Sequence, residues 1–573
     1  MSNKYKEFIN DWPNQKNYAK WLIKYTTPYL PSMALLMGFN ILASLSSVGM
    51  AFVQKKIIDT ATTVAAQHSS AVSSAISTVL PIIGIYILIV IGMLIVNVQS
   101  QLISSVVNEK FAFGIRKQVY EKILHSSWEK VSAYHTGDLM TRLTSDTGTI
   151  ASGISSTIPS IITLIVDFAA AFIAVFTLDP TLALIALLLG PVAVLITFIL
   201  GRKLKKLQVK VQETESEYRS FITESLSNLM IIKAFCNEDY ASNRLTELRN
   251  NRLHWILKKN RMNLAASTAM SGSFQLGYLI AFSWGAYQIA TNGITYGDMS
   301  VFLTLFNKIQ APILALATTV PQVISILASA GRVIELQNLP LEPKEETHLT
   351  PEQVGIKVDS LTFGYNEENI FQNAGIDIKP GEFIAIVGES GIGKTTLIRL
   401  MMSFINSPNG LIEFYNTKGE TELTNGGSRE FISYVPQGNT LFSGTIAENV
   451  RMGNQNASNE EILEALKASS AYGFVEKLPN GIETRIGERG HGLSEGQAQR
   501  VALARALVRQ APFLVLDEAT SSLDEKTELA VLENIRKLQP APTCILITHR
   551  RSVLAYCDRE IKIEDKKIYE MDL

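Results

Sequence analysis

The sequence predicts a membrane α-helical bundle followed by a soluble α/β domain, and the distribution of apolar residues is the main reason. Up to about residue 325 these residues run in long blocks, whereas beyond it they come in short runs. Hydrophobic residues make up 47% of the 573 positions and charged residues only 18%. We expect a membrane domain over residues 1–335, a polar linker over 336–349 and the soluble domain over 350–573.

Charge and cysteine content narrow the possible partners. The formal net charge is −1, which argues against a nucleic-acid partner. The three cysteines, Cys236, Cys544 and Cys557, form no CxxC spacing, so we expect inert thiols in a reduced compartment rather than a disulfide framework. The polar residues 2–15 and the long apolar block that follows predict no cleavable signal peptide.

Six apolar stretches are long enough to cross a bilayer. Each reaches the length of about 20 mainly apolar residues that a spanning helix needs. They lie near Leu30–Phe52, Thr78–Val98, Thr157–Phe176, Thr181–Leu200, Ala265–Ala290 and Val301–Ile324. A buried helix of a soluble protein could resemble one such stretch, but several in a row predict six transmembrane helices. Residues 18–25, before the first span, are expected to form a short helix lying in the membrane interface.

The linkers between these stretches differ in length and charge. Spans two and three, and spans four and five, are separated by charged segments of about 60 residues. Apolar residues such as Phe111, Ile115 and Val119 recur there at helical spacing, so we expect long helical extensions out of the membrane. Basic residues beside the spans place these linkers and both termini in the cytoplasm, although Lys55 and Lys56 break the pattern.

Two ionisable residues fall inside predicted spans. Asp167 lies midway along the third span, and Lys308 lies in the sixth, four residues before Pro312. Charge at membrane depth is costly and usually faces a partner or a wet cavity. Two interpretations stay open. One or both residues line a substrate pathway. Otherwise they form a structural pair, or Lys308 lies closer to the membrane surface than the predicted boundaries imply.

A glycine-rich motif marks the soluble domain. An apolar strand at Phe383–Val387 leads into the pattern GxxxxGKT at residues 388–395, and a helical pattern follows. This is the context of a phosphate-binding loop, in which backbone N–H groups and a helix N-terminus surround the phosphates. Lys394 is expected to reach the β- and γ-phosphates and Thr395 a magnesium ion. The other loop residues expected to contact the nucleotide are Gly388, Ser390, Gly391, Gly393 and Thr396.

Two acids follow a second apolar strand, about 120 residues further on. Asp517 and Glu518 come directly after residues 513–516. At the end of a strand, Asp517 can help to hold magnesium while Glu518 polarises the attacking water. With the phosphate-binding loop, they predict an α/β P-loop ATPase domain that uses ATP and Mg²⁺.

The segment Leu493-Ser494-Glu495-Gly496-Gln497 opens a predicted helix between the two motifs. Here the chain resembles the ATP-binding cassette (ABC) transporters, whose signature is usually LSGGQ. The resemblance implies nucleotide contacts for Ser494, Gly496 and Gln497. It also implies further site residues: Tyr365 on adenine, Gln437 sensing magnesium, Asp524 in the D-loop and His549 near the γ-phosphate. Lys394, Glu518 and His549 are then the expected catalytic residues.

The resemblance extends over nearly the whole chain, in the order of exporter half-transporters. Residues 137–146 look like the family's first coupling segment, residues 224–235 look like its second, and residues 484–490 resemble the cross-linking segment of exporters. Glu495 departs from the signature because it replaces the first glycine, so we expect activity to persist at an altered rate.

The resemblance also implies partners and function. In this family each nucleotide lies between the phosphate loop of one cassette and the signature of another, so a homodimer is expected, with a heterodimer as the alternative. We expect a multi-pass protein of the bacterial cytoplasmic membrane, with the cassette in the cytoplasm. The expected function is ATP-driven export of a peptide, lipid or amphipathic small molecule by alternating access. Alternatives are an importer with the same fold, or a channel or sensor.

Overall fold

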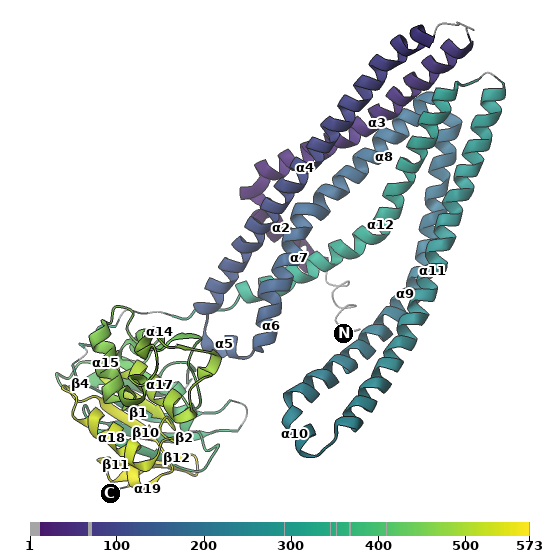
Figure 1. Ribbon diagram of the computed structural model, residues 1–573. Helices are drawn as coiled ribbons and strands as arrows, with labels where there is room; N and C mark the ends of the chain where they lie inside the picture. Colours follow the sequence, from purple (N-terminus) through teal and green to yellow (C-terminus); the bar gives the residue numbers. More distant parts are fainter. Residues whose placement is uncertain are drawn as a thin grey trace. The chain divides into compact units, whose positions relative to one another are not determined.

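The computed structural model describes residues 12–66, 72–291, 293–343, 345, 347–350, 352–365, 368–407 and 409–571. The chain forms two compact units, which Figure 1 colours along the sequence. Unit 1 comprises Met1–Leu124 and His135–Asn338, and unit 2 comprises His125–Tyr134 and Leu339–Leu573. A short stretch of the amino-terminal half therefore belongs to the carboxy-terminal unit.

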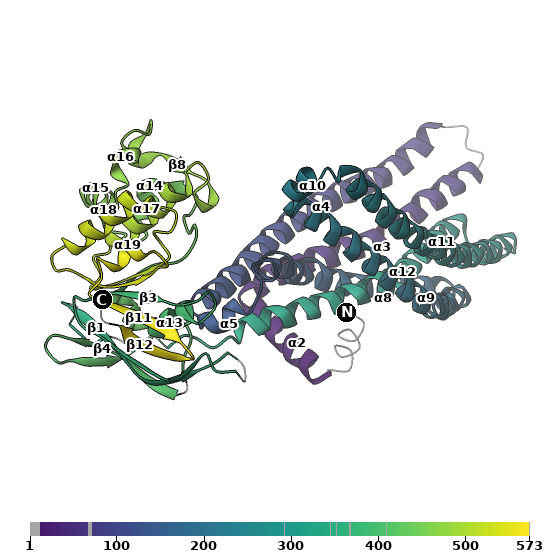
Figure 2. The same cartoon turned by 90° about the horizontal axis from the view of Figure 1, so that it is seen from below.

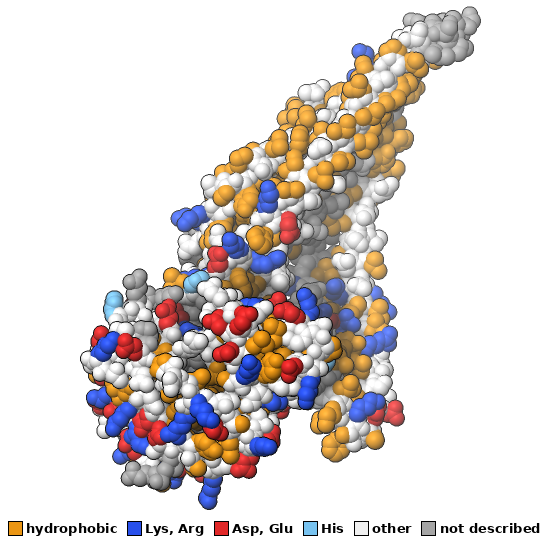
Figure 3. Space-filling view, turned by 60° about the vertical axis from the view of Figure 1, so that its left-hand side comes forward, with side chains coloured by type: hydrophobic (Ala, Val, Ile, Leu, Met, Phe, Trp, Pro, Cys, Tyr) orange, Lys and Arg blue, Asp and Glu red, His pale blue; other side chains and the backbone are white. Residues whose placement is uncertain are grey.

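Long helices form most of unit 1, and each predicted span lies in one of them. They are α3 (Leu30–Ala66), α4 (Val72–Leu124), α8 (Ile158–Leu178), α9 (Pro180–Ser227), α11 (Glu238–Ala290) and α12 (Tyr296–Gln337). Because α4, α9 and α11 continue well beyond the apolar stretches, the prediction of helical extensions is confirmed. Within the described residues, three runs satisfy the length and hydropathy of a membrane span: Asn17–Ala65, Ser77–Leu124 and Thr136–Leu178. Hydrophobic side chains cover much of this unit's surface in Figure 3.

Shorter elements complete unit 1. They are α2 (Trp12–Thr26), η1 (Thr27–Tyr29), α6 (Thr136–Thr141), η2 (Arg142–Asp146), α7 (Thr147–Ser152), η3 (Gly153–Thr157) and α10 (Leu229–Ala234). The elements η2 and η3 are π-helical, so α6 to α8 run as one helix with two locally widened turns. Helix α2 covers the segment for which an interfacial helix was predicted. In Figure 1, α10 lies at the tip of the hairpin formed by α9 and α11.

Lys55, one of the two basic residues that break the charge pattern, has an acidic partner. Lys55 Nζ lies 2.5 Å from Asp298 Oδ1, near the start of α12. One turn further along α3, Asp59 accepts a hydrogen bond of 3.0 Å from the Gly297 N–H. Asp298 also completes a capping box with Thr295 at the start of α12. The positive charge of Lys55 is thus compensated locally.

Two principal sheets form the framework of unit 2. The larger has the order β12-β11-β3-β10-β9-β6, in which β12 is antiparallel and the others are parallel. Its strands are β3 (Phe383–Val387), β6 (Ile432–Val435), β9 (Phe513–Asp517), β10 (Thr543–Ile547), β11 (Arg559–Glu564) and β12 (Lys567–Met571). The smaller sheet is antiparallel, in the order β2-β1-β4-β5. Its strands are β1 (Val354–Phe363), β2 (Phe371–Ile378), β4 (Asn409–Asn416) and β5 (Thr421–Leu423).

Helices cover the larger sheet and create two cores. The helices of unit 2 are α5 (Trp128–Ser132), α13 (Lys394–Met401), α14 (Ile446–Arg451), α15 (Asn459–Ala468), α16 (Tyr472–Val475), α17 (Glu495–Leu507), α18 (Glu525–Arg536) and α19 (Arg551–Leu554). The remaining elements are η4 (Gly427–Phe431), η5 (Gly481–Glu483), η6 (Glu488–Gly490) and the strand pair β7 (Gly444–Thr445) and β8 (Arg485–Ile486). One core packs α14, α15, α17 and α18 on the larger sheet, and the other lies between the sheets around α13. Figure 2 shows α14 to α18 gathered on one side of the strands.

Candidate functional site

The predicted site residues follow parallel strands that end at one edge of the larger sheet. β3 leads into residues 388–396, β6 into Gln437, β9 ends at Asp517, and β10 leads to His549. These four strands are neighbours and run in the same direction. Because the carboxyl ends of parallel strands meet at one edge, these segments converge there.

The glycine-rich loop has the backbone conformation that a phosphate-binding loop needs. Gly391 and Gly393 have φ angles of +83° and +115°, in the region that side chains disfavour. A Cβ at Gly393 would also lie 2.5 Å from Ile370 Cγ2, so the loop leaves no room for a side chain there. α13 begins at the next residue, and the free N–H groups of a helix N-terminus can bind an anion. Ser390 is exposed on this loop, whereas Thr396 is buried in α13.

Lys394 lies over the loop that precedes it. Its Nζ donates a hydrogen bond of 2.6 Å to the Gly388 carbonyl oxygen and lies 3.3 Å from His549 Nε2. Burial lowers the pKa of Lys394, while the nearby carboxylates of Glu518 and Asp517 act in the opposite direction. The ammonium group thus lies near both the glycine loop and the two acids at the end of β9.

Asp517 is buried and suited to binding a cation. Thr395 Oγ1 donates to Asp517 Oδ2 over 3.2 Å, and Tyr434 OH donates to the same oxygen over 3.3 Å. Burial raises the pKa of Asp517, and the hydrogen bonds from Thr395 and Tyr434 only partly oppose this effect. Among the described residues, no group of three or more His, Cys, Asp or Glu side chains could hold a metal ion. A magnesium ion would therefore need oxygens of the nucleotide besides those of Asp517 and Thr395.

Glu518 is held in a strained conformation beside Asp517. Its φ angle is +51°, and its N–H donates a hydrogen bond of 3.1 Å to the Ile547 carbonyl oxygen. A non-glycine residue in this region costs about 1–3 kcal/mol. Gln437 Nε2 donates to Glu518 Oε2 at 2.6 Å, and His549 Nε2 lies 3.5 Å from Oε1. The structure thus brings together four of the residues predicted from separate motifs: Lys394, Gln437, Glu518 and His549.

The signature residues lie at the start of α17 and have other partners. Ser494 and Gln497 form a capping box, with the Gln497 N–H 3.3 Å from Ser494 Oγ and the Ser494 N–H 2.9 Å from Gln497 Oε1. A Cβ at Gly496 would lie 3.0 Å from the Ser522 carbonyl oxygen. Within the described part of the chain, no hydrogen bond or ion pair links these residues to Lys394. Glu495 is exposed at the first position of α17, where the helix dipole favours an acid.

Two further predicted residues lie near the surface. Tyr365 follows β1 and is half exposed, with its ring centroid 5.3 Å from that of Phe363 in an edge-to-face contact. Such a ring has an open face on which a base can stack. Asp524 caps α18, because its carboxylate accepts a hydrogen bond of 3.0 Å from the Thr527 N–H.

Sequence reasoning missed Tyr434, which contacts the proposed metal-binding acid. It lies on β6 and pairs with Val515 on β9, two residues before Asp517. Burial and the neighbouring Asp517 raise the pKa of Tyr434 well above its usual range, so the phenol stays a hydrogen-bond donor. No motif marks this residue, and only the strand pairing could have indicated it.

The two ionisable residues of the predicted spans lie together. Lys308 Nζ on α12 is 3.7 Å from Asp167 Oδ1 on α8. Two serines of α3 surround the pair: Ser44 Oγ donates to Asp167 Oδ1 over 2.6 Å, and Lys308 Nζ hydrogen-bonds Ser47 Oγ. The two charges therefore form an ion pair in the structure. Both side chains remain about one-quarter exposed, so the pair also leaves polar surface accessible.

Comparison with known proteins agrees with this geometry. The model of the ABC transporter transmembrane region matches residues 33–313, and the model of the ABC transporter domain matches residues 371–521. A relative from Desulfotalea psychrophila, named ATP-dependent lipid A-core flippase, is 33% identical over 458 residues, covering 78% of this chain and 79% of its own length. A protein of the same name from Syntrophus aciditrophicus is 29% identical and covers 96% of this chain and 90% of its own.

Two further matches fit the same picture. A Staphylococcus aureus protein, named for multidrug export as an ATP-binding/permease protein, is 30% identical and covers 81% of each chain. A solved structure of a bacterial Atm1-family ABC exporter with ATP bound superposes with a TM-score of 0.79 over 94% of both chains, at 23% identity, and so supports the fold. The chain therefore belongs to the ABC transporters, as an exporter-type half-transporter whose membrane domain precedes its nucleotide-binding cassette.

Proposed function

We propose that the chain hydrolyses ATP to export a peptide, lipid or amphipathic small molecule across the bacterial cytoplasmic membrane. One observation carries this proposal: the phosphate-binding loop, two acids and a histidine converge at the carboxyl edge of one sheet. The names of the relatives, lipid A-core flippase and multidrug export protein, support an amphipathic cargo. Alternating access of the spans to the two sides is the proposed transport mechanism.

Each residue has a role that follows from its position. Lys394 and the α13 N-terminus bind the β- and γ-phosphates, and Tyr365 stacks on adenine. Asp517, Thr395 and Gln437 hold Mg²⁺, which supplies positive charge against the phosphate oxygens. A cation also relieves the cost of burying the Asp517 carboxylate, whose raised pKa reflects that cost.

The hydrolytic step needs a base beside the γ-phosphate. Glu518 accepts the proton of the attacking water, and His549 positions the γ-phosphate from the other side. The Gln437 amide donates a hydrogen bond of 2.6 Å to Glu518. A ligand that binds Gln437 in place of Glu518 would therefore free the Glu518 carboxylate to accept a proton.

A second copy of the chain completes the site. Ser494, Gly496 and Gln497 lie at a helix N-terminus, where they can bind a nucleotide held by the other copy, and Asp524 lies beside this interface. The tip of the α9–α11 hairpin supports the same dimer. Met230 and Phe235 there are 80% and 71% exposed, which is unusual for large apolar side chains in water. We propose that this second coupling segment docks on the cassette of the partner subunit.

The membrane pair is the proposed polar element of the substrate pathway. Asp167 lies 12 residues before Asp179, which follows the end of α8. Lys308 lies 12 residues after Tyr296, which begins α12. At 1.5 Å per residue this is about 18 Å, close to the bilayer midplane. Partly exposed charges at that depth can bind the polar end of an amphipathic cargo.

Replacing the proposed base tests the function directly. Glu518→Gln keeps the side-chain shape and removes the proton acceptor, so ATP turnover of the reconstituted protein should fall about 10²–10⁴-fold. ATP binding should persist, and the closed dimer should accumulate on a native gel. Glu525→Gln is the matched control, because Glu525 is exposed on the first turn of α18. Undiminished turnover in Glu518→Gln would contradict the assignment of Glu518 as the base.

A further inference from the structure

The covalent connections between the two units occur at three places. The chain enters unit 2 after Leu124, returns to unit 1 at His135 and leaves it again after Asn338. Two segments therefore link the cassette covalently to the spans of the same chain. We call residues 125–134 the loop and residues 339–343 the linker. The first coupling segment was predicted at residues 137–146, but the stretch that belongs to the cassette unit is the loop that precedes it.

The loop and the linker are joined to each other in unit 2. The Ser127 N–H donates to the Pro340 carbonyl oxygen at 3.1 Å, and the Glu342 N–H donates to the His125 carbonyl oxygen at 2.9 Å. An antiparallel bridge pairs Ser126 with Leu341. One isolated antiparallel bridge thus joins two segments that are more than 200 residues apart in sequence.

Aromatic and ionic contacts hold this pair on the cassette. The Trp128 ring lies 5.6 Å from the Phe404 ring, and the Arg399 guanidinium lies 5.1 Å above Trp128. The Arg429 guanidinium lies 4.4 Å from the Phe404 ring centroid and also pairs with Glu342, with 3.0 Å between Nη1 and Oε2. A single cluster therefore anchors both the loop and the linker.

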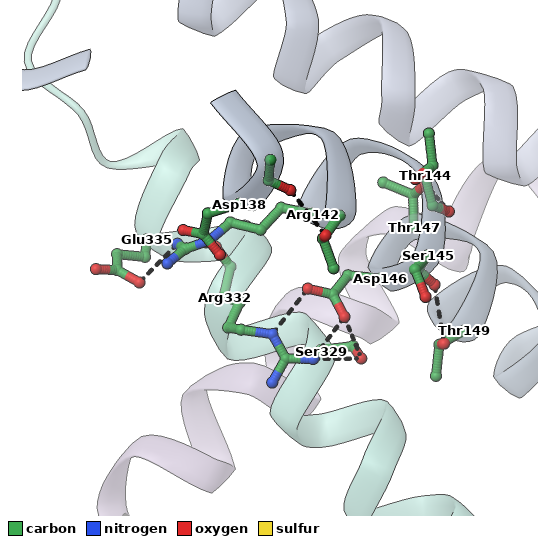
Figure 4. A network of polar contacts seen from close by, with 12 residues as sticks. Asp138, Arg142, Thr144, Ser145, Asp146, Thr147, Thr149, Ser329, Arg332 and Glu335 are labelled. Carbon is green, nitrogen blue, oxygen red and sulfur yellow. Dashed lines mark hydrogen bonds and ion pairs between the residues drawn. The ribbon is translucent and has the colours of Figure 1, made fainter. Parts of the chain in front are cut away.

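An ion pair between the buried carboxylate of Asp146 and the half-exposed Arg332 joins the corresponding helices inside unit 1. Asp146 accepts hydrogen bonds from Arg332 Nε at 2.8 Å, from Arg332 Nη2 at 2.5 Å and from Ser329 Oγ at 2.9 Å (Figure 4). The Asp146 side chain is 5% exposed. Asp146 ends η2 and the other two residues lie on α12, so a charge-assisted contact crosses between these helices.

A second ion pair, between Arg142 and Glu335, lies about one helical turn from the first. Arg142 Nη1 donates to Glu335 Oε2 at 2.8 Å and to the Arg332 carbonyl oxygen at 3.1 Å. Arg142 Nε lies 3.0 Å from Asp138 Oδ2. Figure 4 shows both pairs between the α6–α7 segment and α12. We call Arg142, Asp146, Ser329, Arg332 and Glu335 the ion-pair lock.

Close packing continues from the lock towards the membrane. A Cβ at Gly153 in η3 would lie 2.5 Å from Ile326 Cδ1 on α12, so glycine permits the contact. Further along the same two helices, Lys308 pairs with Asp167. Since α6 to α8 form one continuous helix, the third and sixth spans are joined at successive levels.

We propose that the ion-pair lock contains positioning residues that couple ATP-driven movement of the cassette to the third and sixth spans. The loop leads directly into α6 and the linker leaves directly from α12, and both are anchored by one cluster. A displacement of that cluster reaches two helices at once. The lock makes these helices respond as one body, whereas without it each would follow its own flexible connection. This inference rests on the proposed function.

Spin labels at the outer end of α12 can test the coupling. Tyr296 begins α12 and is exposed, so Tyr296→Cys in a Cys236→Ser background places one label on each copy of a dimer. The other two cysteines are buried and should not react. The label–label distance is measured by pulsed electron resonance in nanodiscs, without nucleotide and after trapping with Mg²⁺, ATP and vanadate. ATP turnover of the same samples reports the cassettes independently.

The lock variants should separate these two readouts. In Asp146→Asn and Arg332→Met, turnover should stay near that of the parent. The ATP-dependent distance population should fall about tenfold, because the charge-assisted hydrogen bonds to the buried Asp146 carboxylate contribute about one decade to an equilibrium constant. Arg332→Lys keeps the charge and should restore most of the change, which a pure packing role would not predict. Arg244→Met is the control, because it breaks the exposed pair with Glu247 on α11.

The outcomes distinguish this inference from the proposed function. A parent without ATP turnover contradicts the proposed function. A parent with turnover but no distance change, or lock variants that keep the full change, overturn the coupling role.

A cross-linking experiment tests the proposal even if the lock variants fail to fold. Asp138 and Glu335 are exposed and contact the same guanidinium, so Asp138→Cys/Glu335→Cys in unlabelled Cys236→Ser protein suits a short bis-thiol reagent. Cross-linked protein should keep its turnover if the helices move as one body. Loss of turnover would mean that the lock must open, which overturns the proposal.

Discussion

Removing the Trp128 ring should release the loop from the cassette by a predictable amount. In Trp128→Ala the contact with Phe404 at 5.6 Å and the cation–π contact with Arg399 at 5.1 Å are both lost. An aromatic pair contributes about 0.5–1.5 kcal/mol and a cation–π contact at a partly exposed site about 0.5–1 kcal/mol. The docked state of the loop should lose about 1–2.5 kcal/mol of stability. The equilibrium constant for its opening should therefore rise roughly 5–70-fold.

Hydrogen exchange measures that equilibrium at two defined amides. The N–H groups of Ser127 and Glu342 form the hydrogen bonds between loop and linker, so they exchange when the docked state opens. Both should exchange faster by the same roughly 5–70-fold factor. Trp128→Phe keeps a ring on Phe404 and should show a smaller effect. Unchanged exchange at both amides in folded Trp128→Ala protein would refute the reasoning.

Three further perturbations address the cassette. Arg550→Ala leaves the fully buried Glu528 carboxylate, 2.7 Å from Arg550 Nη1, without its cation, so chemical denaturation should show a loss of about 3 kcal/mol. Full stability would contradict a contribution from the pair. Gly453→Ala places a Cβ 2.0 Å from a carbonyl oxygen of α17 and should cost about 1–3 kcal/mol, whereas Gly473→Ala meets open space and serves as the control in thermal melts. Burial raises the pKa of Asp517, so the folded protein keeps a proton that the unfolded chain has lost. Its contribution to stability therefore falls as pH rises from the usual carboxyl pKa to the raised one, and Asp517→Asn should remove that fall. Parallel melting profiles of the two proteins across pH, without nucleotide, would rule this out.

Local patterns allowed much of the fold and the nucleotide site to be predicted. The spans depend on long apolar runs, and the phosphate loop depends on a strand, glycines and a helix in immediate succession. Lys394, Asp517 and Glu518 could be assigned because their chemistry depends on strand ends, which are visible in sequence.

Contacts between distant segments were not predictable in the same way. Asp146 and Arg332 are 186 positions apart, and neither belongs to a motif that names its partner. Trp128 was not singled out either, because a lone aromatic in a charged linker gives no indication of what it packs against. Tertiary packing decides such pairings, so the anchoring of the loop and the lock emerged only from the structure.

The Lys55–Asp298 pair also bears on how the chain enters the membrane. The two residues are 243 positions apart, so at about 5–20 residues per second the ribosome makes Asp298 roughly 12–50 s after Lys55. During that time Lys55 has no counter-ion from α12. The pair can therefore stabilise the position of α3 only once the last hairpin has been made.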